Sequence, residues 1–240
     1  MSIHGLSWLL PLPPAIELRG VGLSHSGPPP VTALSPVDLT VGHGELVTVT
    51  GPAGSGKTTL LNVIGLLGRP TTGRYRLNGI DTALLGDRDA AALRGRQIGF
   101  VFQRPQLLLS RSVADNVSLA LLYRGLRAQR RQRRAMDMLD RVGIAGLAGA
   151  LAGQLSAGER QLAAIARALA GGPSLLLCDE PTASLDPGTT DRIIDLLSAV
   201  HRDGGTVLIV TRDPLLADCG TRSFGLGADL LADRAMSPGR

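Results

Sequence analysis

Residues 51–59 have the composition of a loop that binds phosphate. The stretch fits the pattern G-x-x-x-x-G-K-[ST], and it consists of Gly51, Pro52, Ala53, Gly54, Ser55, Gly56, Lys57, Thr58 and Thr59. Glycines permit φ > 0 and let main-chain N–H groups approach a phosphate closely. The lysine of this pattern reaches the β- and γ-phosphates, and the following hydroxyl coordinates Mg²⁺. The stretch therefore predicts a nucleoside triphosphate site.

The surroundings of this stretch support the same chemistry. Lys57 is the only lysine in the chain, and the other strongly basic side chains are all arginines. This points to a position that needs a compact, flexible ammonium instead of a planar fork. Residues 46–50 are apolar and β-branched enough for a buried strand, and 57–67 continue as a helix. A strand that turns sharply into a helix aims N–H groups and the positive end of the helix dipole at one point.

Two adjacent acids follow the apolar run at residues 175–178, namely Asp179 and Glu180. In phosphate-loop NTPases an acid at such a strand end holds Mg²⁺, usually through water. The neighbouring glutamate is then placed to polarise an attacking water as a general base. Because the phosphate loop is also present, and the chain contains only four glutamates, a simple acidic cap on the strand is the weaker explanation.

A second helix start has the features of a phosphate-binding device. Ser156, Ala157, Gly158 and Glu159 precede an apolar run at helical spacing, and by themselves they indicate only a capping box. Their position before the acidic strand end makes the signal more specific. A helix N-terminus with a free hydroxyl and a glycine binds phosphate. One subunit has no obvious use for two such devices, whereas in a dimer the second can face the γ-phosphate held by the partner.

The elements that must position these residues alternate between strand and helix. The sequence predicts strands at residues 15–23, 37–41, 46–50, 74–77, 98–102, 175–179, 206–211 and, at an edge, 223–226. It predicts helices at residues 57–67, 87–94, 126–142, 187–200 and 214–218, and a stretch that is helical throughout at 112–150. Such alternation indicates a parallel sheet covered on both faces, and the helical stretch is interpreted as an insertion.

Composition limits the classes of partner. The chain has 240 residues, a net charge of +5 and only 2% aromatic residues. Basicity permits a nucleic acid or an anionic membrane, but single-strand binders need aromatic stacking platforms, so the arginines at 127–134 indicate a solvated helix face. Cys178 and Cys219 lack metal or redox spacing and are interpreted as reduced thiols. No apolar run approaches the roughly 18 residues of a membrane span.

The ordered set of motifs resembles the ATPase subunits of ATP-binding cassette (ABC) transporters, and is most similar to the lipoprotein-releasing and macrolide-export type. The resemblance covers roughly residues 16–224. It rests on the stretches 51–59, 98–103, 155–161, 177–181, 184–186 and 210–213. It implies a phosphate-loop NTPase core, in which helices flank a mostly parallel sheet, with an N-terminal antiparallel β part and an inserted α-helical subdomain. The expected organisation is a lead-in at 1–14, the ATPase domain at 15–228 with its helical subdomain near 104–170, and a tail at 229–240.

The resemblance also implies partners and further site residues. Gln103 is expected to reach Mg²⁺ or the lytic water. Ser156 and Gly158 are expected to contact ATP across a head-to-tail dimer, and Asp186 to tie the two sites together. The helical insertion is expected to dock on a separate transmembrane permease, which places the chain in the cytoplasm, peripherally on the inner face of the membrane. The implied ligands are ATP and Mg²⁺.

Three features depart from the family pattern, at four positions. His25 stands where an aromatic residue stacks on adenine, so base affinity is expected to fall. Ala157 and Glu159 add a methyl group and a negative charge to the second helix start, which is expected to weaken phosphate binding without abolishing it. Arg212 replaces a histidine that contacts the γ-phosphate. Arginine stays protonated, so it stabilises phosphate charge but cannot shuttle a proton.

These departures leave two principal functions open. The first is an ATP-hydrolysing motor subunit in which Glu180 activates water. The second is a nucleotide-gated clamp that binds ATP and turns it over slowly, because Arg212 misplaces the water. A phosphate-loop kinase or a DNA-repair ATPase is a third class. Kinases have no need of the element at 156–161, and the chain lacks the long coiled coil or zinc spacing of repair ATPases.

Overall fold

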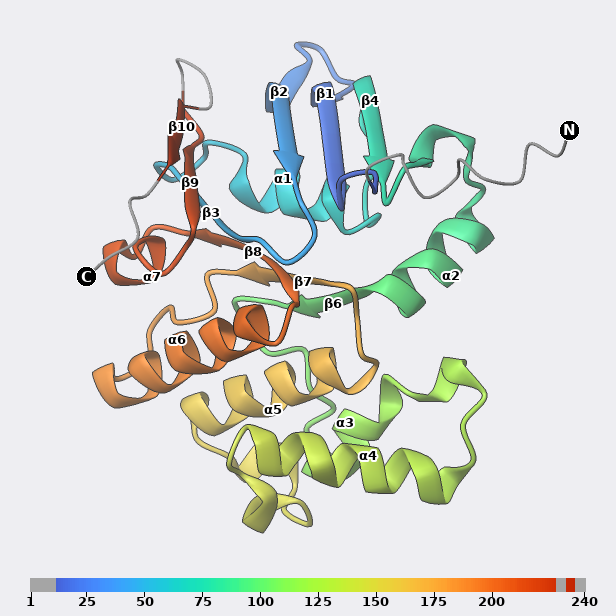
Figure 1. Cartoon of the computed structure of the whole chain (residues 1–240), viewed down its shortest axis with the longest axis vertical. Coiled ribbons are helices and arrows are strands. Elements are labelled where there is room, and N and C mark those ends of the chain that lie inside the picture. Colours follow the sequence, from blue (N-terminus) through green and yellow to red (C-terminus); the bar gives the residue numbers. More distant parts are fainter. Residues whose placement is uncertain (1–11, 228–231, 236–240) are drawn as a thin grey trace, which may run out of the picture.

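A computed structural model describes residues 12–227 and 232–235 of the chain. Its central sheet has six strands in the order β10-β9-β3-β8-β7-β6 (Figure 1). The strands are β3 (Leu46–Thr50), β6 (Ile98–Val101), β7 (Leu175–Asp179), β8 (Thr206–Thr211), β9 (Arg222–Gly225) and β10 (Ala232–Ala235). All neighbours pair in parallel except β10 with β9. The expected parallel core is therefore confirmed.

A second sheet is antiparallel and has the order β2-β1-β4-β5. Its strands are β1 (Ile16–His25), β2 (Val31–Val41), β4 (Thr72–Leu77) and β5 (Ile80–Asp81). The turn between β4 and β5 places Asn78 at φ 50° and Gly79 at φ 78°, which is the left-handed pair that a tight hairpin turn requires. This sheet is the expected N-terminal antiparallel part.

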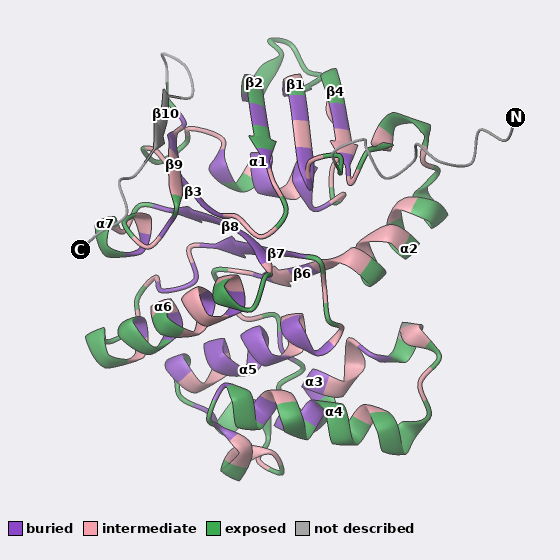
Figure 2. Cartoon of the chain, viewed as in Figure 1, coloured by how far each residue is buried: buried purple, intermediate pink, exposed green. Residues whose placement is uncertain are grey.

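The helices cover the two faces of the parallel sheet and extend below it. They are α1 (Lys57–Ile64), α2 (Asp87–Gln97), α3 (Val113–Leu119), α4 (Ala128–Arg141), α5 (Ala157–Ala170), α6 (Pro187–Arg202) and α7 (Pro214–Ala217). Helices α3, α4 and α5 pack together into a helical lobe, in which α4 keeps its outer side exposed (Figure 2).

The side chains of β7 alternate between two hydrophobic cores. Leu175 and Leu177 pack in the core that contains α1 and the antiparallel sheet, whereas Leu176 and Cys178 pack in the core that contains α5. Successive strand residues point to opposite faces of a sheet. Helices α1 and α5 therefore lie on opposite faces of the parallel sheet (Figure 1).

Several expected boundaries differ from the structure. Strand β2 begins at Val31 instead of residue 37, and it includes Pro36. Proline is tolerated there because β2 is the edge of its sheet and the missing N–H breaks no ladder. Helix α1 ends at Ile64, short of residue 67, and Leu66 adopts a left-handed φ of 55°.

The helical insertion is interrupted, and the expected edge strand is not at the edge. Gly125, at φ 67°, ends the short 3₁₀ turn Leu122–Arg124 and separates α3 from α4. Strand β9 lies inside the sheet because β10 pairs along its free side. The expected lead-in and tail fall mainly on residues outside the described ranges. Within those ranges, no helix combines the length and apolar character needed to cross a bilayer.

Candidate nucleotide site

The phosphate loop runs from the end of β3 to the start of α1. Gly54 has φ 77° and Gly56, the residue that caps α1, has φ 91°. A Cβ atom on Gly56 would lie 2.8 Å from the carbonyl oxygen of Ala33, so that position has no room for a side chain. The loop therefore needs glycine for both conformation and space.

The Lys57 ammonium is folded into this loop. Its Nζ donates to the carbonyl oxygens of Gly51, at 2.7 Å, and Pro52, at 2.8 Å. Burial lowers the pKa of Lys57, as does the charge of Arg212, while Glu180 and Asp179 act in the opposite direction. The cation thus lies close to both expected acids and to a second cation.

The two expected protein ligands of Mg²⁺ are brought together. The hydroxyl of Thr58 donates to Oδ1 of Asp179 at 3.3 Å, across a sequence separation of 121 residues. Burial raises the pKa of the Asp179 carboxyl, and the hydrogen bond from Thr58 lowers it. A hydroxyl and a carboxylate beside a phosphate loop fit Mg²⁺, which takes few protein ligands and completes its shell with phosphate oxygens and water. Within the described ranges, no cluster of three or more histidines, cysteines or acids offers another metal site.

Glu180 is held by three donors. Its Oε2 accepts from the Thr211 hydroxyl at 3.2 Å and from the Arg212 main-chain N–H at 3.0 Å. Its Oε1 accepts from Nε of Arg212 at 3.0 Å, which makes an ion pair. Glu180 also adopts a left-handed φ of 43°, a costly conformation for a non-glycine residue that the surroundings must enforce.

Thr211 is a residue of this site that sequence reasoning missed. It is fully buried at the end of β8, and its hydroxyl also accepts from the main-chain N–H of Asp213 at 2.9 Å. Because β7 and β8 are parallel neighbours, with Asp179 opposite Val210, their ends meet at one edge of the sheet. The signal in the sequence that could have identified Thr211 is a polar residue at the end of β8, the strand that follows Asp179 and Glu180 in the chain.

The second helix start forms the capping box that its sequence predicts. The Ser156 hydroxyl accepts from the main-chain N–H of Glu159 at 3.3 Å, and the Glu159 carboxylate accepts from that of Ser156 at 2.7 Å. The bond from the Ser156 main chain lowers the pKa of Glu159. Ser156 and Ala157 are exposed.

Asp186 lies near the start of α5, because the first turn of α6, which Asp186 caps, contacts Gly158. It caps α6 by accepting from the main-chain N–H of Thr189 at 2.9 Å and from its hydroxyl at 2.7 Å. A Cβ atom on Gly158 would lie 2.8 Å from Cγ2 of Thr189, so the glycine permits this close contact between α5 and α6. The structure thus brings together Asp186 and the stretch 156–159.

Other expected residues make no hydrogen bond to the phosphate loop within the part of the chain that the structure describes. Among the described residues, no hydrogen bond joins 156–159 to 51–59. Gln103 is exposed, and its loop is anchored one residue earlier, where the buried Gln161 of α5 donates to the carbonyl oxygen of Phe102 at 3.3 Å. His25 is exposed at the end of β1.

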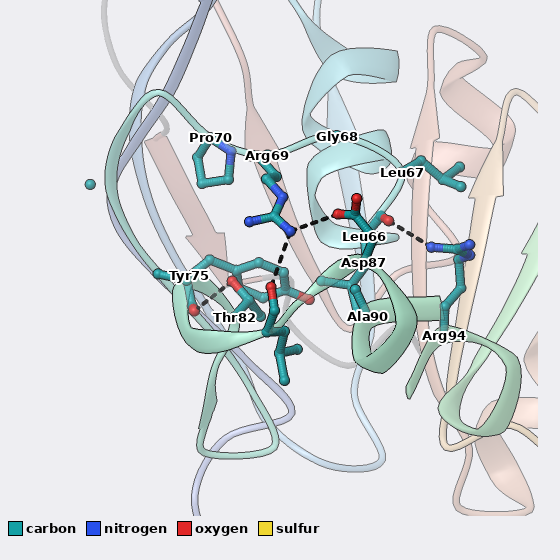
Figure 3. Close-up of a pocket in the computed structure, with 13 residues that line it drawn as sticks. Leu66, Leu67, Gly68, Arg69, Pro70, Tyr75, Thr82, Asp87, Ala90 and Arg94 are labelled. Atoms are coloured by element: carbon teal, nitrogen blue, oxygen red, sulfur yellow. Dashed lines mark hydrogen bonds and ion pairs between the residues drawn. The ribbon is translucent and has the colours of Figure 1, made fainter. Parts of the chain in front are cut away.

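A cavity of about 430 Å³ lies elsewhere, at the far end of α1 (Figure 3). Arg69 reaches into it and donates to Asp87 at 2.7 Å and to the carbonyl oxygen of Leu85 at 3.1 Å. Arg94 donates to the carbonyl oxygen of Leu66 at 2.7 Å. The phosphate loop is at the N-terminus of α1 and this cavity begins beyond its C-terminus, so the cavity is not part of the nucleotide site.

Comparison with known proteins identifies relatives of the whole fold. Residues 34–183 match the ABC transporter family. The chain is 48% identical over 208 residues to the lipoprotein-releasing system ATP-binding protein LolD of Anaeromyxobacter dehalogenans, covering 85% of this chain and 87% of that protein. It is 42% identical over 208 residues to the ABC transporter ATP-binding protein YknY of Bacillus subtilis, covering 86% and 90%.

Longer relatives and solved structures also match the chain over most of its length. The chain is 44% identical over 205 residues to the macrolide export ATP-binding/permease protein MacB 1/2 of Paracoccus denitrificans, but it spans only 31% of that protein's length. A dimeric ATP-binding cassette in a post-hydrolysis state, bound to ADP and Pi, matches with a TM-score of 0.87 and 35% identity, covering 93% of this chain and all of that one. The glycine loop, the paired acids and the shared cassette fold have one explanation: the chain belongs to the ABC transporter family and is one of its ATPases.

Proposed function

We propose that this chain is the ATP-binding subunit of an ABC transporter, which dimerises around ATP and drives a separate membrane-spanning permease. The observation that carries the proposal is the convergence of the phosphate loop, the Thr58–Asp179 pair and Glu180 at one edge of the parallel sheet. The names of LolD and MacB support export, or the release of a lipoprotein-type or lipid-type cargo.

In this proposal each residue has a definite role. Lys57 and the loop N–H groups bind the β- and γ-phosphates, while Thr58, Asp179 and Gln103 hold Mg²⁺ directly or through water. Glu180 accepts a proton from water as the water oxygen attacks the γ-phosphorus. The bond from that phosphorus to the β–γ bridging oxygen breaks, and ADP leaves with the electron pair. His25 stacks on adenine.

The second half of each site comes from the partner subunit. Helices α1 and α5 lie on opposite faces of the sheet, so the stretch 156–159 and the phosphate loop of one chain are poorly placed to share a nucleotide. A head-to-tail dimer brings Ser156, Ala157, Gly158 and Glu159 to the partner's γ-phosphate, with Asp186 at the contact. The dimeric cassettes among the solved relatives support this arrangement.

The membrane partner is expected to contact the helical lobe near residues 104–170. The chain then works in the cytoplasm, peripherally on the inner face of the membrane.

Two measurements test the proposal. Purified protein with Mg²⁺ should bind ATP in a calorimeter, and Lys57→Ala should abolish the heat of binding. A cysteine at Ser156 should crosslink to a cysteine at Ala53 of a second copy only when ATP is present, and Glu180→Gln should strengthen this crosslink by preventing hydrolysis. Absence of both ATP heat and crosslink would contradict the proposal.

The slow, nucleotide-gated clamp is the second candidate, and the hold of Arg212 on Glu180 favours it. A base whose two oxygens already accept three hydrogen bonds is less available to a water molecule. We expect the steady-state ATPase rate to rise several-fold in Arg212→His, which restores a neutral side chain. Equal rates would show that Arg212 does not slow hydrolysis.

A further inference from the structure

We propose that Arg212 is an exchange switch: it pairs with Glu180 until the γ-phosphate of a bound triphosphate takes over its guanidinium and releases Glu180 to act on water. The inference rests on the proposed function and deepens it. It assigns to this site a way of reading the third phosphate before the general base becomes available, so that the position serves as more than a weakened histidine.

The ion pair is asymmetric in a way that suits exchange. The side chain of Glu180 is 11% exposed, whereas that of Arg212 is 54% exposed. Arg212 uses only its main-chain N–H and Nε on the carboxylate. Its two Nη groups make no hydrogen bond or ion pair with any residue of the described ranges, so the guanidinium keeps donors available for phosphate oxygens.

The position of Arg212 brings its charge toward the phosphate loop. Arg212 follows β8 and Glu180 follows β7, at neighbouring strand ends in the parallel sheet. The positive charge of Arg212 is close enough to Lys57 to lower the pKa of that ammonium. A phosphate between the two cations replaces their repulsion with attraction on both sides.

An arginine at position 212 exchanges partners in a different way from a histidine. A guanidinium does not lose its proton at physiological pH, so only a competing anion can end its pairing with Glu180. The triphosphate terminus carries more charge than one carboxylate and accepts bidentate hydrogen bonds. Because the Arg212 side chain is half-exposed, solvent weakens its attraction to Glu180, and the exchange needs little free energy. ADP lacks the third phosphate and leaves the pair intact.

The test compares the dissociation constants of ADP and of a non-hydrolysable ATP analogue in Mg²⁺ buffer, at protein concentrations where light scattering shows monomers. In Arg212→Gln we expect affinity for the analogue to fall about fivefold with ADP unchanged, the size typical of one partly exposed charge-assisted contact. In Arg212→Lys the affinity for the analogue should fall less, because lysine keeps the positive charge. Glu180→Gln should bind the analogue about threefold more tightly than the wild type, because breaking the pair no longer opposes binding.

The double variant Glu180→Gln with Arg212→Gln makes the test decisive. If the two residues exchange partners, the gain from Glu180→Gln disappears when Arg212 is already absent. Arg69→Gln, which removes an exposed guanidinium at the far end of α1, is the matched control and should change neither constant.

Additive effects in the double variant, or equal changes for ADP and the analogue, would overturn the exchange. Failure of the wild type to bind either nucleotide would instead refute the proposed function.

Discussion

The Glu159 side chain has two opposing effects. It stabilises a helix of its own subunit, and its charge is expected to weaken phosphate binding at the proposed dimer site. Its carboxylate completes the capping box of α5 by accepting from the Ser156 N–H at 2.7 Å. The same negative charge lies at a helix N-terminus that the proposed dimer presents to a partner's phosphate. Capping stabilises the helix, whereas like charge opposes phosphate binding.

Replacing Glu159 with glutamine separates these effects. Glutamine keeps the capping geometry and removes the charge, so we expect the thermal midpoint to stay within about 2 °C, since one retained cap costs little. ATP-dependent dimerisation of the Glu180→Gln protein should tighten about threefold, the size of one exposed charge interaction. Analytical ultracentrifugation measures the dimer dissociation constant, and Glu45→Gln is the control for loss of a carboxylate elsewhere. Weaker dimerisation would show that the carboxylate is needed at the contact.

Asp186 gives the fold a pH dependence of known sign. The hydrogen bonds from Thr189 hold the pKa of Asp186 below its ordinary value of 3.8. A carboxyl with a lowered native pKa stabilises the protein above its unfolded pKa, and this contribution disappears as the pH falls through the native pKa. Urea midpoints should therefore separate wild type from Asp186→Ala at neutral pH and converge in strong acid. A constant difference at every pH would contradict a charge effect.

At the scale of elements, α1 is fixed at both ends by side chains and loops from other segments. Its N-terminus carries the phosphate loop, and its last residue, Ile64, has a carbonyl oxygen that accepts from the Tyr75 hydroxyl at 2.7 Å. Tyr75 is 1% exposed, and burial raises the pKa of its phenol. The antiparallel sheet thereby positions the helix that binds the phosphates.

Removal of that one hydroxyl should be measurable. Tyr75→Phe leaves the buried carbonyl of Ile64 without this partner, at an expected cost of about 1–2 kcal/mol in the free energy of unfolding. Urea denaturation measures the change, and affinity for ATP should fall by less than about threefold, since the loop itself is untouched. An unchanged midpoint would mean that water replaces the lost donor.

The elements predictable from sequence were those buried on both faces. The bounds of β3, β7 and β8 agree with the structure because such strands are continuous apolar runs. The first half of β2 was missed because it is an exposed edge that contains Pro36. The pairing of Glu180 with Arg212 could not be predicted, since it depends on the register of two strands and on side-chain reach.

At the scale of the whole molecule, helix α6 makes polar contacts with the end of α4 in the helical lobe. Arg192 of α6 donates to the carbonyl oxygens of Val142, at 2.7 Å, and Gly143, at 2.8 Å, where α4 ends. Arg141 pairs with Asp203 at 2.5 Å, at the other end of α6. Since Asp186 caps the N-terminus of α6, the proposed dimer contact and the lobe that is expected to meet the permease are linked by one helix.

Loosening that link should affect the lobe more than the sheet. Arg192→Met keeps the aliphatic stem and removes both hydrogen bonds, so we expect hydrogen exchange to accelerate several-fold at 128–143 and to stay unchanged in β7 and β8. Mass spectrometry after deuterium labelling reads both regions, and Arg133→Met on the exposed side of α4 is the control. Equal acceleration in the sheet would mean that the lobe and core open together.

The seclusion of Lys57 has a practical consequence. No other residue of the polypeptide carries a side-chain amine, and this one is 7% exposed between two loop carbonyls. Lys57 is therefore the single interior amine that an acylating reagent can modify. The rate at which Lys57 is acylated reports how often the phosphate loop opens. Nucleotide that occupies the loop should slow this acylation, so nucleotide binding can be followed on the unsubstituted protein.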